Sequence, residues 1–323
     1  MNGLATALTL FCLTATAQTS IPDEELAEIV VTAPEARYVA PTTRDRIGRV
    51  WVPVTVDGKG PFRLVLDTGA QHSAVTLATA AQLGIPLDRY PHVLVHGATG
   101  SSIEPAIAVG NLQVGDLMLQ PATMPVVADV FGGAEGLLGT EGMQEHRIYM
   151  DFRHDIISIT RSKNRSAPEG FSTVHFLPDS LHLLVVRADV GTVPVRAIFD
   201  TGAQATVGNT ALLEALRRHH TRNQIAGTDH VQGATGEWQT GAGVVLPSIR
   251  LGSLTVSNAH VTFADLHIFE RWGFTEQPAL VIGMDLIGLV DELVIDYHRQ
   301  ELQIKPRPLA PSHTERFQLF PPT

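Results

Sequence analysis

Apolar and polar positions alternate along most of the chain, in short runs that are separated by glycine-rich turns. Residues 51–56 and 63–66 alternate or run apolar with β-branched side chains, and the intervening residues 57–60 (Asp-Gly-Lys-Gly) are a hairpin signal. Two further runs within residues 182–199 repeat this arrangement around a Val-Gly-Thr turn at residues 190–192. The pattern therefore predicts a β-hairpin in each half of the chain.

Helical spacing is confined to a few short segments. Alanine and leucine recur at helical intervals in residues 77–84 and 210–219, and a glycine closes the first segment. A further short helix is expected after Gly283. Because strands dominate and no alternation of strands with long helices occurs, the prediction is an all-β fold with a few short helices, and a doubly wound sheet is excluded.

Five landmarks occur twice in the chain, in the same order. The pentapeptide Asp-Thr-Gly-Ala-Gln begins at Asp67 and again at Asp200, which is 200 − 67 = 133 residues later. The second landmark is Gly-Ala-Thr-Gly at residues 97–100 and 233–236, and the third is Gly-x-Leu at 115–117 and 252–254. The fourth is two apolar residues before a glycine, at 137–139 and 281–283, and the fifth is aspartate before an aromatic residue, at 151–152 and 296–297. This ordered repetition predicts a duplicated lobe, spanning residues 46–162 and then 173–305.

The repeated pentapeptide presents one carboxylate from each half of the chain. An apolar run leads into each turn, so Asp67 and Asp200 would meet if a two-fold axis related the halves. Two carboxylates in contact cannot both ionise cheaply, so they share one proton. The ionised member can then accept a proton from water while the protonated member donates to a peptide carbonyl oxygen. A single Asp-Thr-Gly is most often an ordinary turn, but two copies in duplicated surroundings predict a catalytic pair for peptide hydrolysis.

The three residues after each aspartate are suited to support such a pair. Glycine lets the opposite turn approach closely, threonine can form hydrogen bonds across the interface, and alanine is small enough to lie beside the carboxylates. These residues are Thr68, Gly69, Ala70, Thr201, Gly202 and Ala203. Since alanine offers no hydroxyl to an ionised carboxylate, the pair should lose its protons at a higher pH than one supported by serine or threonine. We therefore expect activity at mildly acidic to near-neutral pH.

Together these motifs resemble aspartic peptidases of the retropepsin-like type, with both halves fused in one polypeptide as in certain bacterial envelope proteases. The resemblance covers residues 48–305. It implies two β-barrel lobes related by pseudo-two-fold symmetry, with Asp67 and Asp200 as the catalytic pair. It also implies two flaps that close over the substrate backbone, although ordinary hairpin turns are the alternative for these segments. The flap residues would be Gly97, Ala98, Thr99, Gly100, Gly233, Ala234, Thr235 and Gly236.

Two details bear on how far the resemblance extends. Pepsin-like enzymes carry serine or threonine after Asp-Thr-Gly, a flap tyrosine and usually disulfides, whereas this chain has alanine there and no tyrosine between Tyr90 and Tyr149. The retropepsin-like interpretation is therefore favoured. The first half departs from the family pattern at residues 140–142 (Thr-Glu-Gly), which leaves the helix at that position in doubt.

Composition narrows the function mainly by exclusion. The net charge is -10 and 17% of the residues are charged, without a run of basic residues, which disfavours a nucleic-acid partner. His219 and His220 lie among arginines without a zinc-binding spacing, so a solvated basic helix end is the favoured interpretation. The sequence contains no phosphate-binding glycine loop. Neither a metal nor an organic cofactor is expected.

The N-terminal segment has the pattern of an exported protein. Residues 4–17 are apolar or small and end in Ala-Thr-Ala, which fits a signal peptide at residues 1–17 and a periplasmic or secreted location. Residues 18–45 are polar, acidic and proline-bearing, and we expect a flexible leader. Within it, residues 28–33 resemble the short box by which outer-membrane receptors engage the TonB protein, so an envelope partner is an alternative to a solvated leader. The leader could instead block the cleft as a propeptide, but its acidic charge differs from the basic prosegments of pepsin-type enzymes.

The sequence thus predicts an exported aspartic endopeptidase, active as a monomer, that binds an extended peptide or protein substrate in the cleft between its lobes. The alternative is a non-catalytic peptide-binding module of the cell envelope with the same fold, although both aspartates and their turns are intact. His72 either tunes one side of the cleft or faces solvent, with solvent favoured. Trp238 either lines a substrate pocket or packs in the core, and residues 306–323 form a proline-rich tail.

Overall fold

The computed structural model describes residues 28–30, 49–114, 117–119, 123–154, 156–177, 179, 183–219 and 224–307. The predicted signal peptide, most of the leader and residues 308–323 of the tail lie outside the described residues. Among those described, 51% lie in strands and 11% in helices, which confirms the prediction of an all-β fold with few helices. No helix in this part of the chain is long and apolar enough to cross a membrane.

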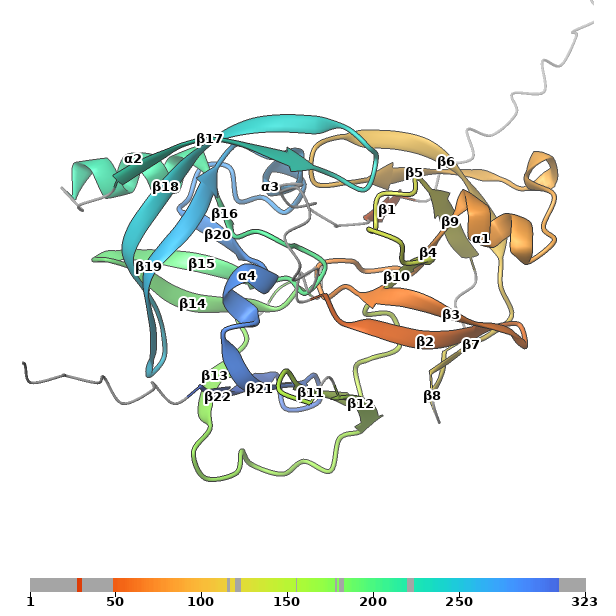
Figure 1. Ribbon diagram of the computed structural model, residues 1–323, viewed down its shortest axis with the longest axis horizontal. Helices are drawn as coiled ribbons and strands as arrows, with labels where there is room; N and C mark the ends of the chain where they lie inside the picture. Colours follow the sequence, from red (N-terminus) through yellow and green to blue (C-terminus); the bar gives the residue numbers. More distant parts are fainter. Residues whose placement is uncertain are drawn as a thin grey trace, which may run out of the picture.

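The first sheet has ten strands and builds the first lobe (Figure 1). In order across the sheet they are β1 (Glu28–Val30), β5 (His92–His96), β6 (Ser101–Ala108), β9 (Thr123–Val127), β4 (Ala74–Thr76), β10 (Gly136–Leu138), β3 (Lys59–Leu66), β2 (Trp51–Val56), β7 (Leu112–Val114) and β8 (Leu117–Leu119). β2 and β3 form the predicted hairpin, in which Asp57 and Gly58 have φ values of 46° and 76°. Aspartate and glycine tolerate such positive φ values, so the local sequence determines this turn.

β1 differs from the expectation of a flexible leader, because its three residues pair with β5 at the edge of the sheet. Its sequence, Glu-Ile-Val, contains two β-branched residues, which suit an edge strand. The strand depends on a partner more than 60 positions away in the chain, as the register of Ile29 with Val95 shows. Local sequence patterns do not reveal such a pairing.

The second sheet has seven strands and builds the second lobe. In order they are β14 (Val185–Val190), β15 (Val193–Phe199), β20 (Ala279–Ile282), β16 (Val207–Gly208), β19 (Leu254–Phe263), β18 (Trp238–Leu251) and β17 (Gln224–Gln232). The hairpin of β14 and β15 corresponds to that of β2 and β3, and the parallel pair β15–β20 corresponds to β3–β10. Both lobes therefore place a parallel strand beside the strand that leads into the aspartate turn.

A third sheet of five strands joins the lobes and lies below the other two sheets in Figure 1. Its order is β12 (Ile156–Arg161), β11 (His146–Asp151), β21 (Val290–Asp296), β22 (Glu301–Pro306) and β13 (Ser172–His175). β11 and β21 pair antiparallel, with Tyr149 opposite Val294. These positions differ by 294 − 149 = 145, the same offset that separates the Asp-aromatic landmarks at 151 and 296. Tyr149 thus faces its own equivalent, Val294, and the pseudo-two-fold axis passes through this pair.

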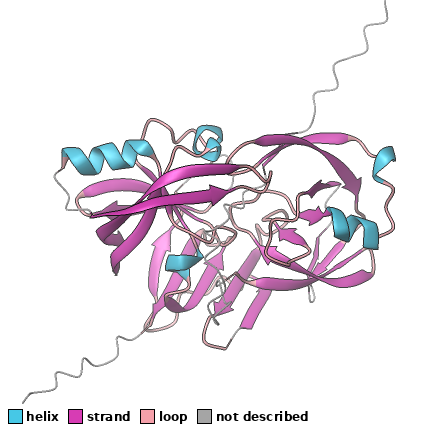
Figure 2. Ribbon diagram, turned by 45° about the horizontal axis from the view of Figure 1, so that its top comes forward, coloured by secondary structure: helices cyan, strands magenta, loops and turns pink. Residues whose placement is uncertain are grey.

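Three helices occur where the sequence predicts them, namely α1 (Leu77–Gln82), α2 (Thr210–Arg218) and α4 (Met284–Ile287). Thr76 caps α1 by accepting a hydrogen bond from the Thr79 N–H at 3.2 Å, and Asn209 caps α2 in the same way through Leu212 at 2.9 Å. Figure 2 shows α1 and α2 at opposite ends of the molecule, outside the strands. The short helices α3 (His267–Arg271) and η1 (Leu87–Arg89) were not predicted, and residues 140–142 form turns where α4 has its equivalent.

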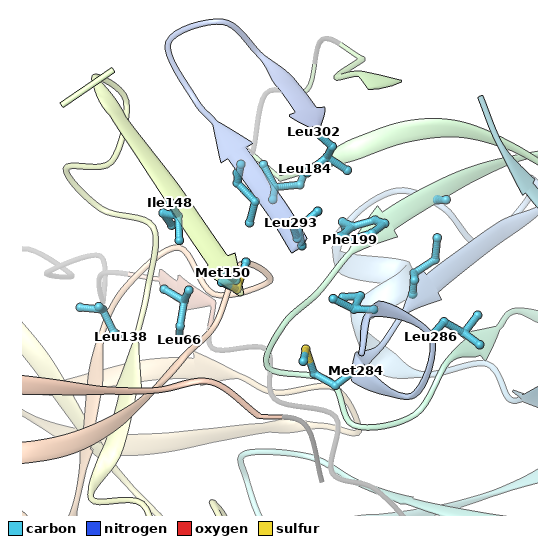
Figure 3. Packing of buried hydrophobic residues seen from close by; sticks show 14 of the residues in the cluster. Leu66, Leu138, Ile148, Met150, Leu184, Phe199, Met284, Leu286, Leu293 and Leu302 are labelled. Atoms are coloured by element: carbon cyan, nitrogen blue, oxygen red, sulfur yellow. The ribbon is translucent and has the colours of Figure 1, made fainter. Parts of the chain in front are cut away.

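One apolar core runs through both lobes and the shared sheet. In Figure 3, Leu66 and Leu138 of the first lobe lie near Met150 of β11, and Leu293 of β21 lies toward Phe199 of the second lobe. All five side chains are at most 3% exposed. Burial of one such side chain contributes about 1.5–3 kcal/mol. Because Leu66 and Phe199 directly precede the two aspartates, the packing that stabilises the lobes also holds the aspartate turns in place.

Candidate active site

The two aspartate turns follow directly after β3 and β15. The Asp67 N–H donates a hydrogen bond to Leu138 O at 2.9 Å, and the Asp200 N–H donates to Ile282 O at 3.0 Å. Leu138 and Ile282 are the last residues of the parallel strands β10 and β20. Each turn is therefore attached to its own lobe by the same bond at the equivalent position.

Thr68 and Thr201 fasten the two turns to each other. The Thr68 N–H donates to Thr201 Oγ1 at 3.1 Å, and the Thr201 N–H donates to Thr68 Oγ1 at 3.0 Å. The Thr68 hydroxyl donates to Phe199 O at 2.8 Å, and the Thr201 hydroxyl donates to Leu66 O at 2.7 Å. Both threonines are buried, so these bonds lie in a low-dielectric interior, where an unpaired polar group is costly. The four bonds follow the pseudo-two-fold symmetry.

Gly69 and Gly202 face the carboxyl group of the opposite turn. A Cβ atom added to Gly69 would lie 2.5 Å from Asp200 Oδ2, and one added to Gly202 would overlap the Asp67 carboxyl group. No residue with a side chain fits at either position unless the aspartates move. The two glycines therefore allow each turn to approach the carboxyl group of the other.

The carboxyl groups of Asp67 and Asp200 are fully buried and held in similar ways. Asp67 Oδ1 accepts a hydrogen bond from the Gly69 N–H at 2.9 Å. Asp200 Oδ1 accepts from the N–H groups of Gly202 and Ala203 at 2.8 Å and 3.1 Å. Both aspartates are 0% exposed, and their Oδ2 atoms accept no hydrogen bond from another described group. The two carboxyl groups interact with each other, so a proton can be shared between them.

Burial raises the pKa of both aspartates, but not to the same extent. The pKa of Asp67 is well above its usual range because of burial first and the negative charge of Asp200 second. Burial raises the pKa of Asp200 to about 6, against the lowering effects of the Gly202 and Ala203 N–H groups and of the Arg49 cation. The pair therefore holds one proton at a higher pH than two free aspartates would.

Arg49 and Tyr297 also lie near the pair, although the sequence patterns do not single them out. The guanidinium nitrogens of Arg49 are buried, and its positive charge counteracts the burial that raises the pKa of Asp200. Burial and then the charge of Asp67 raise the pKa of the Tyr297 hydroxyl. Tyr297 belongs to the Asp-aromatic landmark, whose copy in the first lobe has Phe152 instead. That difference between the copies is the signal that could have drawn attention to Tyr297.

The two predicted flap segments touch each other at their tips. Residues 97–100 turn between β5 and β6, residues 233–236 turn between β17 and β18, and Figure 1 shows the two hairpins reaching toward each other. A Cβ on Gly97 would lie 3.1 Å from Thr235 N, and one on Gly233 would lie 2.8 Å from Thr99 N. The absence of side chains at these glycines thus lets the backbones of the two segments meet.

Each flap packs against the opposite lobe. Ala98 lies in an apolar cluster with Phe269 of α3, and its carbonyl accepts a hydrogen bond from the Ile268 N–H at 3.2 Å. Ala234 lies in the corresponding cluster of the first lobe, with Phe131. Both alanines are 0% exposed. The two predicted flap segments are therefore held against the opposite lobes, which is a closed arrangement.

A histidine pair adds a further contact to the first flap. His96 Nδ1 lies 2.6 Å from Ser101 Oγ and 3.3 Å from His267 Nε2, and Ser101 Oγ lies 2.8 Å from the same Nε2. His96 and Ser101 flank the first flap turn, whereas His267 begins α3 in the second lobe. Burial first, and His267 second, lower the pKa of His96. At the equivalent positions of the second flap the chain has Gln232 and Glu237, so this contact is particular to the first.

The remaining sequence expectations have mixed outcomes. His72 is half-buried and burial lowers its pKa, so its side chain is partly exposed to solvent. Trp238 is 56% exposed at the start of β18, which excludes core packing. His219 is exposed at the end of α2, after Arg217 and Arg218, as expected of a basic helix end. Within the described part of the chain, no three acidic, histidine or cysteine side chains are grouped as metal ligands.

Two lobes related by a pseudo-two-fold axis, with one buried aspartate turn from each, define the architecture of an aspartic protease. A family model described as aspartyl protease matches residues 52–141 and 186–286, which is more than half of the chain and one segment in each lobe. The chain therefore belongs to the aspartyl protease family, and the two matches correspond to two retropepsin-like lobes. No curated protein matches the chain.

Proposed function

We propose that this protein is an aspartic endopeptidase, in which Asp67 and Asp200 activate one water molecule to hydrolyse a peptide bond. The observation that carries the proposal is the burial of two carboxyl groups, one from each lobe, whose raised pKa values favour one proton on the pair near neutral pH. Membership of the aspartyl protease family supports peptide-bond hydrolysis in general.

In this proposal Asp200 is the general base and Asp67 is the general acid. Asp200 accepts a proton from water while the water oxygen attacks the peptide carbonyl carbon, and Asp67 donates its proton to the carbonyl oxygen. The product of this step is a tetrahedral diol. Asp200 then passes its proton to the amide nitrogen, the C–N bond breaks, and the acid proton returns from a diol hydroxyl to Asp67. The pair ends with one proton, as it began.

The composition of the turns favours activity at mildly acidic to near-neutral pH. Ala203 supplies an N–H group to Asp200 at 3.1 Å, but no side-chain hydroxyl. The pKa of Asp200, raised by burial to about 6, then sets the acid-side limb of the pH–rate profile, because the base must be ionised. A profile that peaks below about pH 3, under the reference value for aspartate, would contradict this assignment.

The substrate in this proposal is a peptide in extended conformation, held between the flaps and the aspartate turns. The glycines of the flaps bring main-chain N–H and C=O groups near the peptide, which supports pairing that depends little on side chains. One chain supplies both aspartates, so the monomer is proposed to be active. The signal-like pattern of residues 1–17 supports export to the periplasm or the medium.

Cleavage of a mixed peptide library by the wild type and three variants tests the proposal. Asp67→Asn and Asp200→Asn preserve the size of the side chain but remove the shared proton, so cleavage should fall by roughly 10³-fold or more. Asp88→Asn replaces an exposed aspartate in η1 and should cleave as the wild type does. Equal cleavage by the wild type and the two dyad variants would reject the proposal. Peptide binding without cleavage by any of the four proteins would indicate the non-catalytic peptide-binding module instead.

A further inference from the structure

The leader contributes one strand to the folded protein, and that strand lies on a flap. β1 (Glu28–Val30) runs parallel to β5, with Ile29 opposite Val95 and Val30 opposite His96. Figure 1 shows β1, in red, next to β5 at the side of the first lobe that faces the second. A segment from the region before the first lobe is therefore part of the sheet that forms the first flap.

β5 is the outer strand of the first flap hairpin. One of its edges pairs with β6 and the other pairs with β1. The last residue of β5, His96, directly precedes the flap turn at residues 97–100, and β1 runs in the same direction as β5. β1 therefore ends beside the base of the flap turn. A strand edge at this place offers main-chain N–H and C=O groups in register for an extended peptide.

The second lobe shows what this edge offers when no leader strand lies on it. β17 (Gln224–Gln232) is the outer strand of the second flap and the terminal strand of its sheet. It pairs with β18, and no strand within the described ranges pairs with its other edge. The two flaps are equivalent by the internal repeat. One equivalent edge is thus occupied by β1, and no strand of the described part of the chain lies on the other.

We propose that β1 occupies the edge of the first flap with which an extended peptide substrate pairs, and that it thereby holds the full-length chain in a less active state. The inference rests on the proposed function and adds regulation to it, since leader and substrate compete for β5. Such competition lowers the apparent affinity for substrate by the fraction of molecules in which the edge is free. The acidic charge of the leader does not oppose this role, because strand pairing uses the main chain.

β1 also favours the closed position of the flap. A two-stranded hairpin is marginally stable by itself, and a third strand stabilises it. The flap that carries β1 packs Ala98 against the second lobe, and Asp67 and Asp200 beneath the closed flaps are 0% exposed. Release of β1 should therefore both expose the pairing edge and make the flap easier to open.

Proline at position 29 of the full-length chain tests the inference by hydrogen–deuterium exchange. Proline has no N–H and a fixed φ, so Ile29→Pro should remove β1 from β5. The backbone amides of residues 92–96 should then exchange at least about tenfold faster, while those of β17, residues 224–232, stay unchanged as an internal reference. Ser20→Pro changes the leader outside β1 and should leave both segments unchanged. The same comparison in the Asp67→Asn background excludes self-cleavage of the leader as a cause.

Peptide cleavage is the second readout. kcat/KM should rise by about tenfold in Ile29→Pro, with most of the change in KM, whereas Ser20→Pro should match the wild type. A synthetic peptide with the sequence of residues 24–33 should inhibit the Ile29→Pro variant competitively when it is added in trans.

The two readouts distinguish a failure of this inference from a failure of the proposed function. Unchanged exchange at residues 92–96 in Ile29→Pro would overturn the inference, even in an enzyme that cleaves peptides. Faster exchange with unchanged kcat/KM would also overturn it, because leader and substrate would then not compete. Faster exchange in a protein that cleaves no peptide would reject the proposed function, while it would support β1 as the occupant of the flap edge.

Discussion

The two lobes hold their aspartates with the same bonds, but they surround them with different side chains. Thr68 and Thr201 exchange equivalent hydrogen bonds, and each aspartate N–H donates to the last carbonyl of a parallel strand. These shared parts are backbone groups and the Asp-Thr-Gly residues themselves. The repeat therefore builds a symmetric pair of carboxyl groups, and any functional difference between them must come from their surroundings.

The surroundings differ at the residue that directly precedes Val50 in the first lobe and Leu184 in the second. The residue before each aspartate donates a backbone hydrogen bond of 2.9 Å, to Val50 in the first lobe and to Leu184 in the second. The preceding positions are thus equivalent, and they hold Arg49 and Leu183. A cation with buried guanidinium nitrogens in one lobe and an aliphatic side chain in the other make the surroundings of the pair asymmetric. Burial raises the pKa of Asp200, and the charge of Arg49 is one of the smaller effects that oppose this rise.

The largest effect is expected where the symmetric part of the site requires glycine. In Gly69→Ala or Gly202→Ala the new Cβ would overlap the opposite carboxyl group, so the turns must move apart. We expect a loss of about 3 kcal/mol or more in the free energy of unfolding and of roughly 100-fold or more in kcat/KM. Chemical denaturation and peptide cleavage measure these changes. Gly170→Ala controls for backbone strain alone, because φ is 86° there but a Cβ meets nothing within 4 Å. Equal losses in all three variants would contradict the close approach of the turns.

The next effect is a pH dependence of stability that arises from the buried pair. The pKa values of both buried aspartates are raised, that of Asp200 from 3.8 to about 6, so the folded state binds extra protons in this range. The stabilisation is fully present below about pH 4 and is lost as the pH rises through 6, by on the order of 3 kcal/mol for Asp200 alone. Thermal unfolding from pH 4 to 8 measures the effect. The double variant Asp67→Asn/Asp200→Asn should lack this component, and the same slope in both proteins would refute the assignment.

The sequence predicts those parts of the molecule that depend on local patterns or on the repeat. The β2–β3 turn follows from Asp57 and Gly58, which accept positive φ values, and the duplication locates both aspartate turns. β1 and α3 escape prediction because neither has a strong local signal. Three residues of the leader form a strand only through a distant partner, and the N-cap residue of α3, Leu266, provides no side-chain cap. The packing of Ala98 against α3 depends on both lobes being folded, so no segment of sequence contains it.

A smaller and symmetric effect is expected from the two threonines. Thr68→Val and Thr201→Val keep the shape of the side chain but remove one donor and one acceptor from a buried network. Each variant should lose about 2 kcal/mol in the free energy of unfolding, and the double variant should lose less than the sum because the partners are shared. Thr228→Val, at an exposed position of β17, is the matched control. A difference of more than about 1 kcal/mol between the two single variants would show that the network is not symmetric.

The smallest effect, and the sharpest test of the difference between the lobes, is expected from Arg49→Leu. This change gives the first lobe an aliphatic residue at the position where the second lobe has Leu183. Burial raises the pKa of Asp200, and without the opposing charge of Arg49 that pKa should rise further. The acid-side limb of the pH–rate profile should then move to higher pH, with a decrease of a few-fold in kcat/KM below pH 6 and little change above pH 7, where Asp200 is ionised in either case. Arg49→Lys retains the charge and should keep the limb in place. Equal profiles for Arg49→Leu and Arg49→Lys would mean that the charge of Arg49 does not decide which aspartate holds the proton.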